Sequence, residues 1–458
     1  MSKTIQSTHK HTFALQILAV TFVNIVIRFF SYPWLPKYLV FDEKYYVPQV
    51  LGMFYRQPHE TVGEAGFRFF ENMDGALDIY GSSERAVQSI DTFQHPPFGK
   101  WLIGLGTLFF DDSMNPSAWR LSSVVASILL AVMTMIIVKD LLPKFTYAPL
   151  VTGVLFTADG QFLTMGRLGM LDIFVALFVA LGVVFFVKTL LRLKAMHDAL
   201  NNKASTQNKK IIVIYSILSG ISFGLAVAVK WNALTWLAII GITLLVMAIY
   251  YKTMLPFWSA VSVGLSSILS YVTSWFLLPV QSTGFFHKLI EIFDYHLYIA
   301  RFMLTEDSPS TTSGLIPFPL SWIVQKSQWG YSNCNPQGTA VENCSTVINS
   351  GNVVLWVAVW ISVAAVLVLV SMKKLPKITI VAPVMFVAGV LPWLSGIRTP
   401  WLSYSIQILP FGVISLVIFI WFLWTKTHGS LRIVCIIFTI LLLTTVFVVS
   451  VAQLNHWL

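Results

Sequence analysis

The chain has 458 residues, of which 56% are hydrophobic and 11% charged, and its mean hydropathy is +0.74. A soluble globular domain carries about 25% charged residues, so this composition excludes that class. The net charge of +10 does not indicate a nucleic-acid-binding protein, because the basic residues are dispersed along the chain. Repeated apolar runs of about 20 residues instead predict an all-α polytopic membrane protein.

Eleven apolar runs are long enough to cross a membrane. The predicted spans are 12–30, 118–138, 146–164, 170–190, 211–229, 232–250, 257–279, 352–372, 378–395, 402–424 and 431–451. The first run has no small-residue cleavage site and is long enough to span, so we expect no cleavable signal peptide. No internal repeat stands out.

The connections between the spans fall into two sets. One set is rich in Lys and Arg and has only Asp140 and Asp198 as acidic residues, so the positive-inside rule places it in the cytoplasm. The N-terminus is then cytoplasmic and, with an odd number of spans, the C-terminus is extracytoplasmic. The other set includes two long loops, 31–117 and 280–351, which hold 16 of the 20 acidic residues. We expect these loops to fold against the outer membrane surface and to carry the function.

The first long loop begins with VFDEKYYVPQ at 40–49, where Asp42 and Glu43 are adjacent. Neighbouring residues on a helix diverge by about 100°, so the two carboxylates cannot both reach one atom. One can act as a base while the other positions a substrate or partner; a solvated loop start is the alternative. No cluster at metal-ligand spacing accompanies them, so we expect no divalent metal.

The same loop ends with FQHPPFGKWLIGLG at 93–106. The pair Pro96–Pro97 stops any preceding helix, and Lys100 lies near the start of an amphipathic segment. The stretch therefore predicts a rigid entry into an interfacial helix with a cation at its start. His95, at the break, is more commonly a hydrogen-bonded structural residue than a catalyst.

Several charged residues lie at or near the predicted outer ends of the spans. They are Arg120, Arg167, Asp172, Lys230 and Arg398. An ionised side chain in hydrocarbon is costly, so such residues commonly face a cavity, a partner or an anionic ligand. Snorkelling to the headgroups is the alternative for each, and a structural ion pair is the simplest account of Arg167 and Asp172. Four cations on one face, with Lys100 as a fifth, favour a site that grips a phosphate.

The second long loop contains Cys334 and Cys344, which can form a disulfide if the loop is extracytoplasmic. Cys435 lies inside an apolar run and is expected to be a small buried residue. The sequence NCS at 343–345 fits the N-glycosylation pattern, which is frequent by chance.

Six motifs in order resemble those of the bacterial, actinobacterial-type protein O-mannosyltransferases of glycosyltransferase family 39. They are VFDEKYY (40–46), HPPFGKWLIGLG (95–106), WRL (119–121), ADGQFLTMGRLGMLDIF (158–174), GLAVAVKWNAL (224–234) and LPWLSGIRTPWLSY (391–404). The resemblance extends over almost the whole chain. It implies one GT-C transmembrane domain over residues 1–458 with eleven spans. The loop at 280–351 is too short to hold a MIR domain.

The resemblance also implies a polyprenyl-phosphate-mannose donor and a Ser or Thr hydroxyl of an exported protein as acceptor. It implies Asp42 as general base, Glu43 as the residue that positions the acceptor, and Arg120 as the arginine of the second span. The chain departs from the family at Phe93, where relatives often have an aspartate; Asp91 is a candidate substitute. Two further departures are SPSTTSG (308–314), in place of a His-Pro-aromatic stretch, and Pro400, in place of a large apolar residue.

The expected reaction is a direct displacement that inverts the sugar carbon. Asp42 takes the hydroxyl proton, and cations stabilise the leaving phosphate, with Arg120 and Arg398 ranked first. No cofactor is expected. The expected enzyme lies in the plasma membrane with its active site outside, in association with the secretion machinery. The alternatives are a GT-C transferase with another polyprenyl-phosphate sugar or with a lipid or glycan acceptor, and a lipid-linked-sugar transporter, which typically shows repeats and midplane charges.

Overall fold

The computed structural model describes residues 3–31, 39–70, 82–201, 209–276, 284–305, 321–324, 326–329, 347–395 and 400–455. Within this part of the chain, ten helices are long and apolar enough to cross a membrane. They are α1 (Lys3–Ser31), α7 (Pro116–Leu141), α10 (Asp172–Asn201), α11 (Lys209–Val229), α12 (Leu234–Tyr251), α13 (Leu255–Phe276), α16 (Val353–Ser371), α17 (Val381–Val390) with the 3-10 turns η3 (Lys377–Ile380) and η4 (Leu391–Ser395), α18 (Leu409–Lys426) and α19 (Gly429–Asn455). The prediction of a multi-pass helical membrane protein is confirmed.

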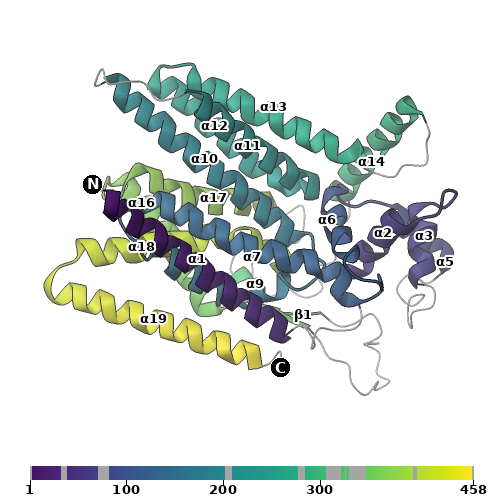
Figure 1. The fold of residues 1–458 in the computed structure, drawn as a ribbon, viewed down its shortest axis with the longest axis horizontal. Helices are drawn as coiled ribbons and strands as arrows, with labels where there is room; N and C mark the ends of the chain where they lie inside the picture. The colour runs from purple at the N-terminus through teal and green to yellow at the C-terminus, as the bar shows by residue number, and fades with distance from the viewer. Residues whose placement is uncertain are drawn as a thin grey trace.

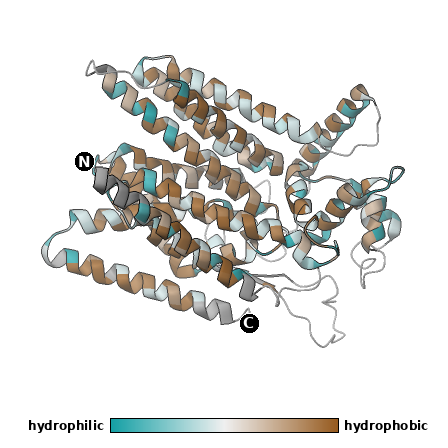
Figure 2. Cartoon of the chain, viewed as in Figure 1, coloured by the Kyte–Doolittle hydropathy of each residue, from teal (hydrophilic) through white to brown (hydrophobic). Residues whose placement is uncertain are grey.

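The long helices run side by side, with α10 to α13 on one side of the bundle and α1, α7 and α16 to α19 on the other (Figure 1). Hydrophobic residues cover most of their length, and hydrophilic ones collect near their ends (Figure 2). Close packing between α11 and α13 depends on small residues: a Cβ at Gly220 would collide with Ser266, and Ser267 Oγ donates to Gly220 O over 2.8 Å. This is how membrane helices commonly approach without a hydrophobic driving force between them.

The third predicted span, 146–164, is wrong as a single helix. The structure divides it into α8 (Ala148–Thr157) and α9 (Gly160–Met165). Asp159 interrupts it, because its Oδ1 accepts hydrogen bonds from Gln161 N at 3.0 Å and Phe162 N at 3.1 Å and so caps α9. A hydropathy window averages this one carboxylate with its many apolar neighbours, which hides the break.

The two long loops contribute further helices at one end of the bundle (Figure 1). The first loop forms α2 (Glu43–Tyr55), α3 (Val62–Phe70), α5 (Ser83–Asp91) and α6 (Phe98–Thr107). The second forms α14 (Phe285–Thr305), α15 (Ser321–Val324) and an antiparallel pair, β1 (Lys326–Trp329) and β2 (Val347–Ser350), with Lys326 opposite Ser350. Helix α6 begins directly after Pro96–Pro97, as the sequence predicts.

The two ends of the bundle differ, because the loop helices lie at only one of them among the described residues (Figure 1). Helix α1 begins at the end opposite to α2, α3, α5 and α6, and α19 ends on the same side as these helices (Figure 1). The described chain therefore enters and leaves the bundle at opposite ends. Helix α10 lies in the interior, where Ile173, Val179 and Val183 are fully buried, which explains why its sequence is apolar all round.

Candidate active site

Glu43, the first residue of α2, is fully buried and lies at the centre of a hydrogen-bond network. Its Oε1 accepts from Arg120 Nε and from Gly169 N, both at 2.7 Å. Its Oε2 accepts from Arg120 Nη2 at 2.6 Å and from Val40 N at 2.9 Å. The carboxylate thus joins the start of the first loop to α7 and to the turn before α10.

Asp42 precedes Glu43 but lies in different surroundings. It is partly exposed, and its Oδ2 accepts from the Tyr46 hydroxyl at 3.2 Å. Burial raises the pKa of the Asp42 carboxyl above its usual value, while the nearby Lys230 ammonium lowers the pKa and Asp172 raises it. Among the described residues, Asp42 is therefore a partly exposed carboxylate with spare hydrogen-bonding capacity, as a general base requires.

The backbone before Asp42 is strained. Phe41 has a φ of 50°, in the left-handed region that a bulky L-residue rarely adopts. Such a conformation costs about 1–2 kcal/mol. The hydrogen bonds between Val40 and Glu43, through Glu43 N to Val40 O at 3.0 Å and Val40 N to the Glu43 carboxylate, hold this turn. Strain of this kind is commonly found where a side chain must be aimed for function.

Lys230 faces Asp42 from the junction of α11 and η2 (Trp231–Ala233). Its Nζ lies 2.9 Å from Asp172 Oδ2 and 5.0 Å from the centre of the Tyr404 ring. Asp172 Oδ1 accepts from Gln407 Nε2 at 2.7 Å. The expected ion pair between Arg167 and Asp172 is therefore wrong: Lys230 is the partner of Asp172, and Arg167 Nε donates to Leu163 O at 3.0 Å.

Lys100 is the second ammonium near this point. It is almost fully buried, its Nζ donates to His95 O at 2.9 Å, and it lies 4.3 Å from the centre of the Phe93 ring. Burial lowers the pKa of the Lys100 ammonium, and Lys230 lowers it further. His95 thus fixes Lys100 through its backbone, and an anion bound near Lys100 and Lys230 would relieve their mutual repulsion.

The remaining predicted residues lie in other surroundings. Arg120 is fully buried and directed to Glu43, so a contact with a donor phosphate stays a prediction. Asp91 accepts from Gly63 N at 2.6 Å and from Thr61 Oγ1 at 2.8 Å, which joins α5 to the start of α3. Arg398, Cys334 and Cys344 lie outside the described residues. Cys435 is buried, as expected.

Two polar residues that the sequence did not single out, Gln161 and Ser405, hold the far side of the site. They connect α9 to η5 (Leu402–Gln407), the turn that carries Tyr404 and Gln407. Gln161 Nε2 donates to Leu402 O, and Ser405 Oγ donates to Gln161 Oε1 at 2.5 Å. Gln161 belongs to the quoted ADGQ motif, but its partners are about 240 residues away and no local pattern indicates them.

Trp231, the residue after Lys230, lines an apolar cavity. It has a volume of about 300 Å³ and lies between α11, α12 and α13. Its lining includes Val227, Trp231, Leu234, Ile268 and Tyr271. Trp231 Nε1 donates to the Tyr271 hydroxyl at 3.0 Å, which fixes the indole directly after Lys230 in the chain.

Two comparisons with known sequences agree. The family model of dolichyl-phosphate-mannose-protein mannosyltransferases matches residues 86–296. The polyprenol-phosphate-mannose–protein mannosyltransferase of Corynebacterium glutamicum is 25% identical over 472 residues, which cover 89% of this chain and 84% of that protein. The enzyme of the same name from Mycolicibacterium smegmatis is 26% identical over 212 residues, which cover 45% of this chain and 36% of that protein. Over these residues the chain is similar to the protein mannosyltransferases.

Solved structures show the fold. A structure of the S. cerevisiae protein O-mannosyltransferase Pmt1-Pmt2 complex bound to the sugar donor matches with a TM-score of 0.69 at 11% identity, over 96% of this chain and 89% of that chain. ArnT from Cupriavidus metallidurans in the apo state matches with a TM-score of 0.55 at 13% identity, over 96% of this chain and 75% of that chain. The GT-C fold expected from the sequence is confirmed, with ten spanning helices in the described part and a broken third span.

Proposed function

We propose that this protein transfers mannose from polyprenyl-phosphate-mannose to Ser or Thr hydroxyls of exported proteins, by a direct displacement that inverts the sugar carbon. The observation that carries the proposal is the position of Asp42 near Lys230, together with an apolar cavity that is lined by Trp231, the residue after Lys230. A base, a cation and an apolar cavity are what a hydroxyl acceptor, a leaving phosphate and a prenyl tail require. The names of the relatives supply the sugar and the acceptor class.

Asp42 acts as the general base in this mechanism. A hydroxyl is a poor nucleophile near neutral pH, so a carboxylate must take its proton while the new bond to the sugar carbon forms. The raised pKa makes Asp42 a stronger base than an exposed aspartate. The Tyr46 hydroxyl donates to Oδ2 of the Asp42 carboxylate, which leaves Oδ1 to accept the proton of the acceptor hydroxyl.

Lys230 and Lys100 stabilise the leaving polyprenyl phosphate. Negative charge builds on the phosphate as its bond to mannose breaks, and cations fixed in a dry site stabilise that charge. Lys230 is held by Asp172, and Lys100 by the His95 carbonyl, so neither must reorganise when the charge develops. Arg120, Arg167 and Arg398 complete the predicted set of phosphate ligands.

The prenyl tail would follow the cavity between α11, α12 and α13. Trp231, directly after Lys230, lines this cavity, and the lining is almost entirely apolar. A phosphate at Lys230 would therefore place the first isoprene units against Trp231 and Leu234. This arrangement accounts for the use of a membrane helix bundle as the scaffold for a sugar transfer.

We further propose that the active site faces the outside of the plasma membrane. The positive-inside rule favours an N-terminus in the cytoplasm and the loop helices α2, α3, α5 and α6 outside. Glu43 would then support the acceptor site through the first loop, and the acceptor would arrive from the secretion machinery. The mechanism uses no divalent metal.

The test is mannose transfer in vitro. Purified protein in detergent receives polyprenyl-phosphate-mannose and a Ser/Thr-rich peptide, with Asp42→Asn and Asp112→Asn in parallel. Asp112 is a carboxylate of the same loop that accepts only a local bond from Met114 N, so it is a matched control. We expect mannosylated peptide from the wild type and the control, and none from Asp42→Asn. Near-normal turnover by Asp42→Asn would refute the assignment of the base.

A donor panel tests the substrate itself. Polyprenyl phosphates that carry glucose or an aminosugar should give no product if the mannose assignment holds. Product with a different sugar would retain the fold and the base but change the substrate.

A further inference from the structure

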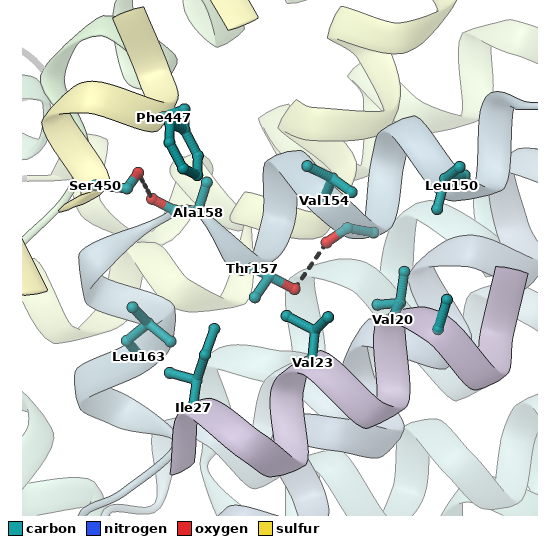
Figure 3. Close-up of a pocket in the computed structure, with 12 residues that line it drawn as sticks. Val20, Val23, Ile27, Leu150, Val154, Thr157, Ala158, Leu163, Phe447 and Ser450 are labelled. Carbon is teal, nitrogen blue, oxygen red and sulfur yellow. Dashed lines mark hydrogen bonds between the residues drawn. The ribbon is translucent and has the colours of Figure 1, made fainter. Parts of the chain in front are cut away.

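A second apolar cavity lies on the opposite side of the bundle. It has a volume of about 210 Å³ and is walled by α1, α8, α9 and α19 (Figure 3). Helix α1 contributes Val20, Val23 and Ile27, α8 contributes Val154, and α19 contributes Phe447. No residue of this set lines the cavity at Trp231, so the two cavities are separate sites.

The two hydroxyl groups in the lining already have partners. Thr157 Oγ1 donates to Gly153 O at 2.8 Å and accepts from Asn24 Nδ2 at 2.8 Å. Ser450 Oγ donates to Val446 O at 2.7 Å and to Ala158 O. A water molecule needs two to four polar partners, and apolar cavities of about 150 Å³ stay dry and take up hydrocarbon. The lining therefore suits a hydrocarbon ligand.

The cavity opens on the lipid-facing surface. Its rim residues are well exposed, with 47% of Val23, 53% of Val154 and 64% of Phe447 accessible. They continue the exposed apolar surface of α1 and α19, which includes Leu18 and Val448. Both helices are long and apolar enough to span, so the medium around this opening is the hydrocarbon of the bilayer.

We propose that this second cavity, called the crevice below, is a binding site for one acyl chain of a membrane phospholipid. Phospholipid acyl chains surround the opening, whereas the tail of a donor held at Lys230 enters the other cavity. The floor of the crevice is formed by Thr157 and Ala158, where α8 ends. The bound chain thus packs against the break in the third span, between α8 and α9.

The first experiment counts bound lipid. Protein is solubilised in mild detergent, stripped by repeated detergent exchange, incubated with phosphatidylglycerol or phosphatidylethanolamine, and weighed by native mass spectrometry. Val23→Trp places a larger side chain at the rim of the crevice and should reduce the retained phospholipid by one molecule per protein. Leu18→Trp is the matched control, because Leu18 is 63% exposed on the same helix but does not line the crevice.

Retention of the same number of lipids by Val23→Trp and wild type would overturn the proposal. Displacement of the phospholipid by polyprenyl phosphate alone would also overturn it, because the crevice would then belong to the donor. If Val23→Trp fails to fold, Ala19→Phe at the same rim gives a second filled variant. A rise in the thermal midpoint on addition of phospholipid, present in wild type and Leu18→Trp and lost in the filled variant, is the expected second signal.

Discussion

Glu43 lies in a buried hydrogen-bond network and Asp42 is the proposed base, so substitutions of the two should differ in their effects on stability and on mannose transfer. Glu43→Gln keeps the size of the side chain but removes the charge that balances Arg120, and both side chains are fully buried. Four donors converge on the carboxylate: two nitrogens of Arg120, Gly169 N and Val40 N. A glutamine offers one acceptor oxygen and turns an NH₂ group towards the remaining donors.

The expected loss is about 3–5 kcal/mol in the free energy of unfolding, the range for a buried ion pair that loses one partner. Asp42→Asn should change this free energy little, because Asp42 is partly exposed and, among the described residues, its carboxylate accepts only the Tyr46 hydroxyl. Unfolding of the purified protein by denaturant in mixed micelles measures both. The ion pair between Glu60 and Arg68 is a control: its side chains are 22% and 39% exposed, so Glu60→Gln should have a smaller effect than Glu43→Gln.

The opposite result would refute this reasoning. If Glu43→Gln unfolds at the same denaturant concentration as wild type and still loses mannose transfer, Glu43 acts on the acceptor and its network contributes little to stability. If Asp42→Asn is the unstable variant, the strained turn at Phe41 depends on Asp42 and the proposed base needs a new assignment.

The site makes three further predictions. Asp42 must be deprotonated to act as a base, and burial raises its pKa, so kcat/KM should fall on the acid side at a pH above the ordinary aspartate value of about 3.9. Lys230→Met removes a charge that lowers the pKa of Asp42, so the acid limb of the pH profile should move to higher pH. An unchanged acid limb would contradict the coupling between Lys230 and Asp42. Ser405→Ala should raise KM for the donor several-fold more than it lowers kcat, because η5 holds Tyr404 and Gln407 around Lys230 and Asp172. Ser415→Ala is the control: the Ser415 hydroxyl donates to Phe411 O in its own helix, so both constants should stay unchanged. Equal effects of the two variants would show that η5 does not position the site. Chelation with EDTA should leave the transfer rate unchanged, and a loss restored by Mg²⁺ or Mn²⁺ would show a metal requirement.

Hydropathy predicted most of the bundle because a membrane span is defined by its length and apolar content. It failed at Asp159, where a local capping geometry decides the structure and the surrounding residues remain apolar. The resemblance of ADGQ to a family motif marked this place but gave no reason for the break. The partners of Asp159 include Asn352 N at 2.9 Å and Trp356 Nε1 at 3.1 Å, which no local pattern could supply.

In the candidate site, too, the sequence predicted which residues are present but not which distant residues they contact. Motif content predicted that Asp42, Glu43, Lys100 and Lys230 belong near one face of the bundle. Sequence proximity suggested the wrong partner for Asp172, because Arg167 is five residues away and Lys230 is 58 residues away. The turn after α9 directs Arg167 back to Leu163, so distance along the chain is a poor guide when a turn intervenes.

The turn at Phe41 makes the position of the proposed base, Asp42, dependent on parts of the chain that are distant in sequence. Its left-handed backbone persists because Glu43 is fixed from outside, and one of the fixing groups, Gly169 N, lies 126 residues away. A Cβ at Gly169 would come within 3.4 Å of the Glu43 carboxylate and 3.3 Å of the Trp119 ring. The packing of the turn before α10 therefore supports Glu43 and, through the backbone turn at Phe41, the position of Asp42.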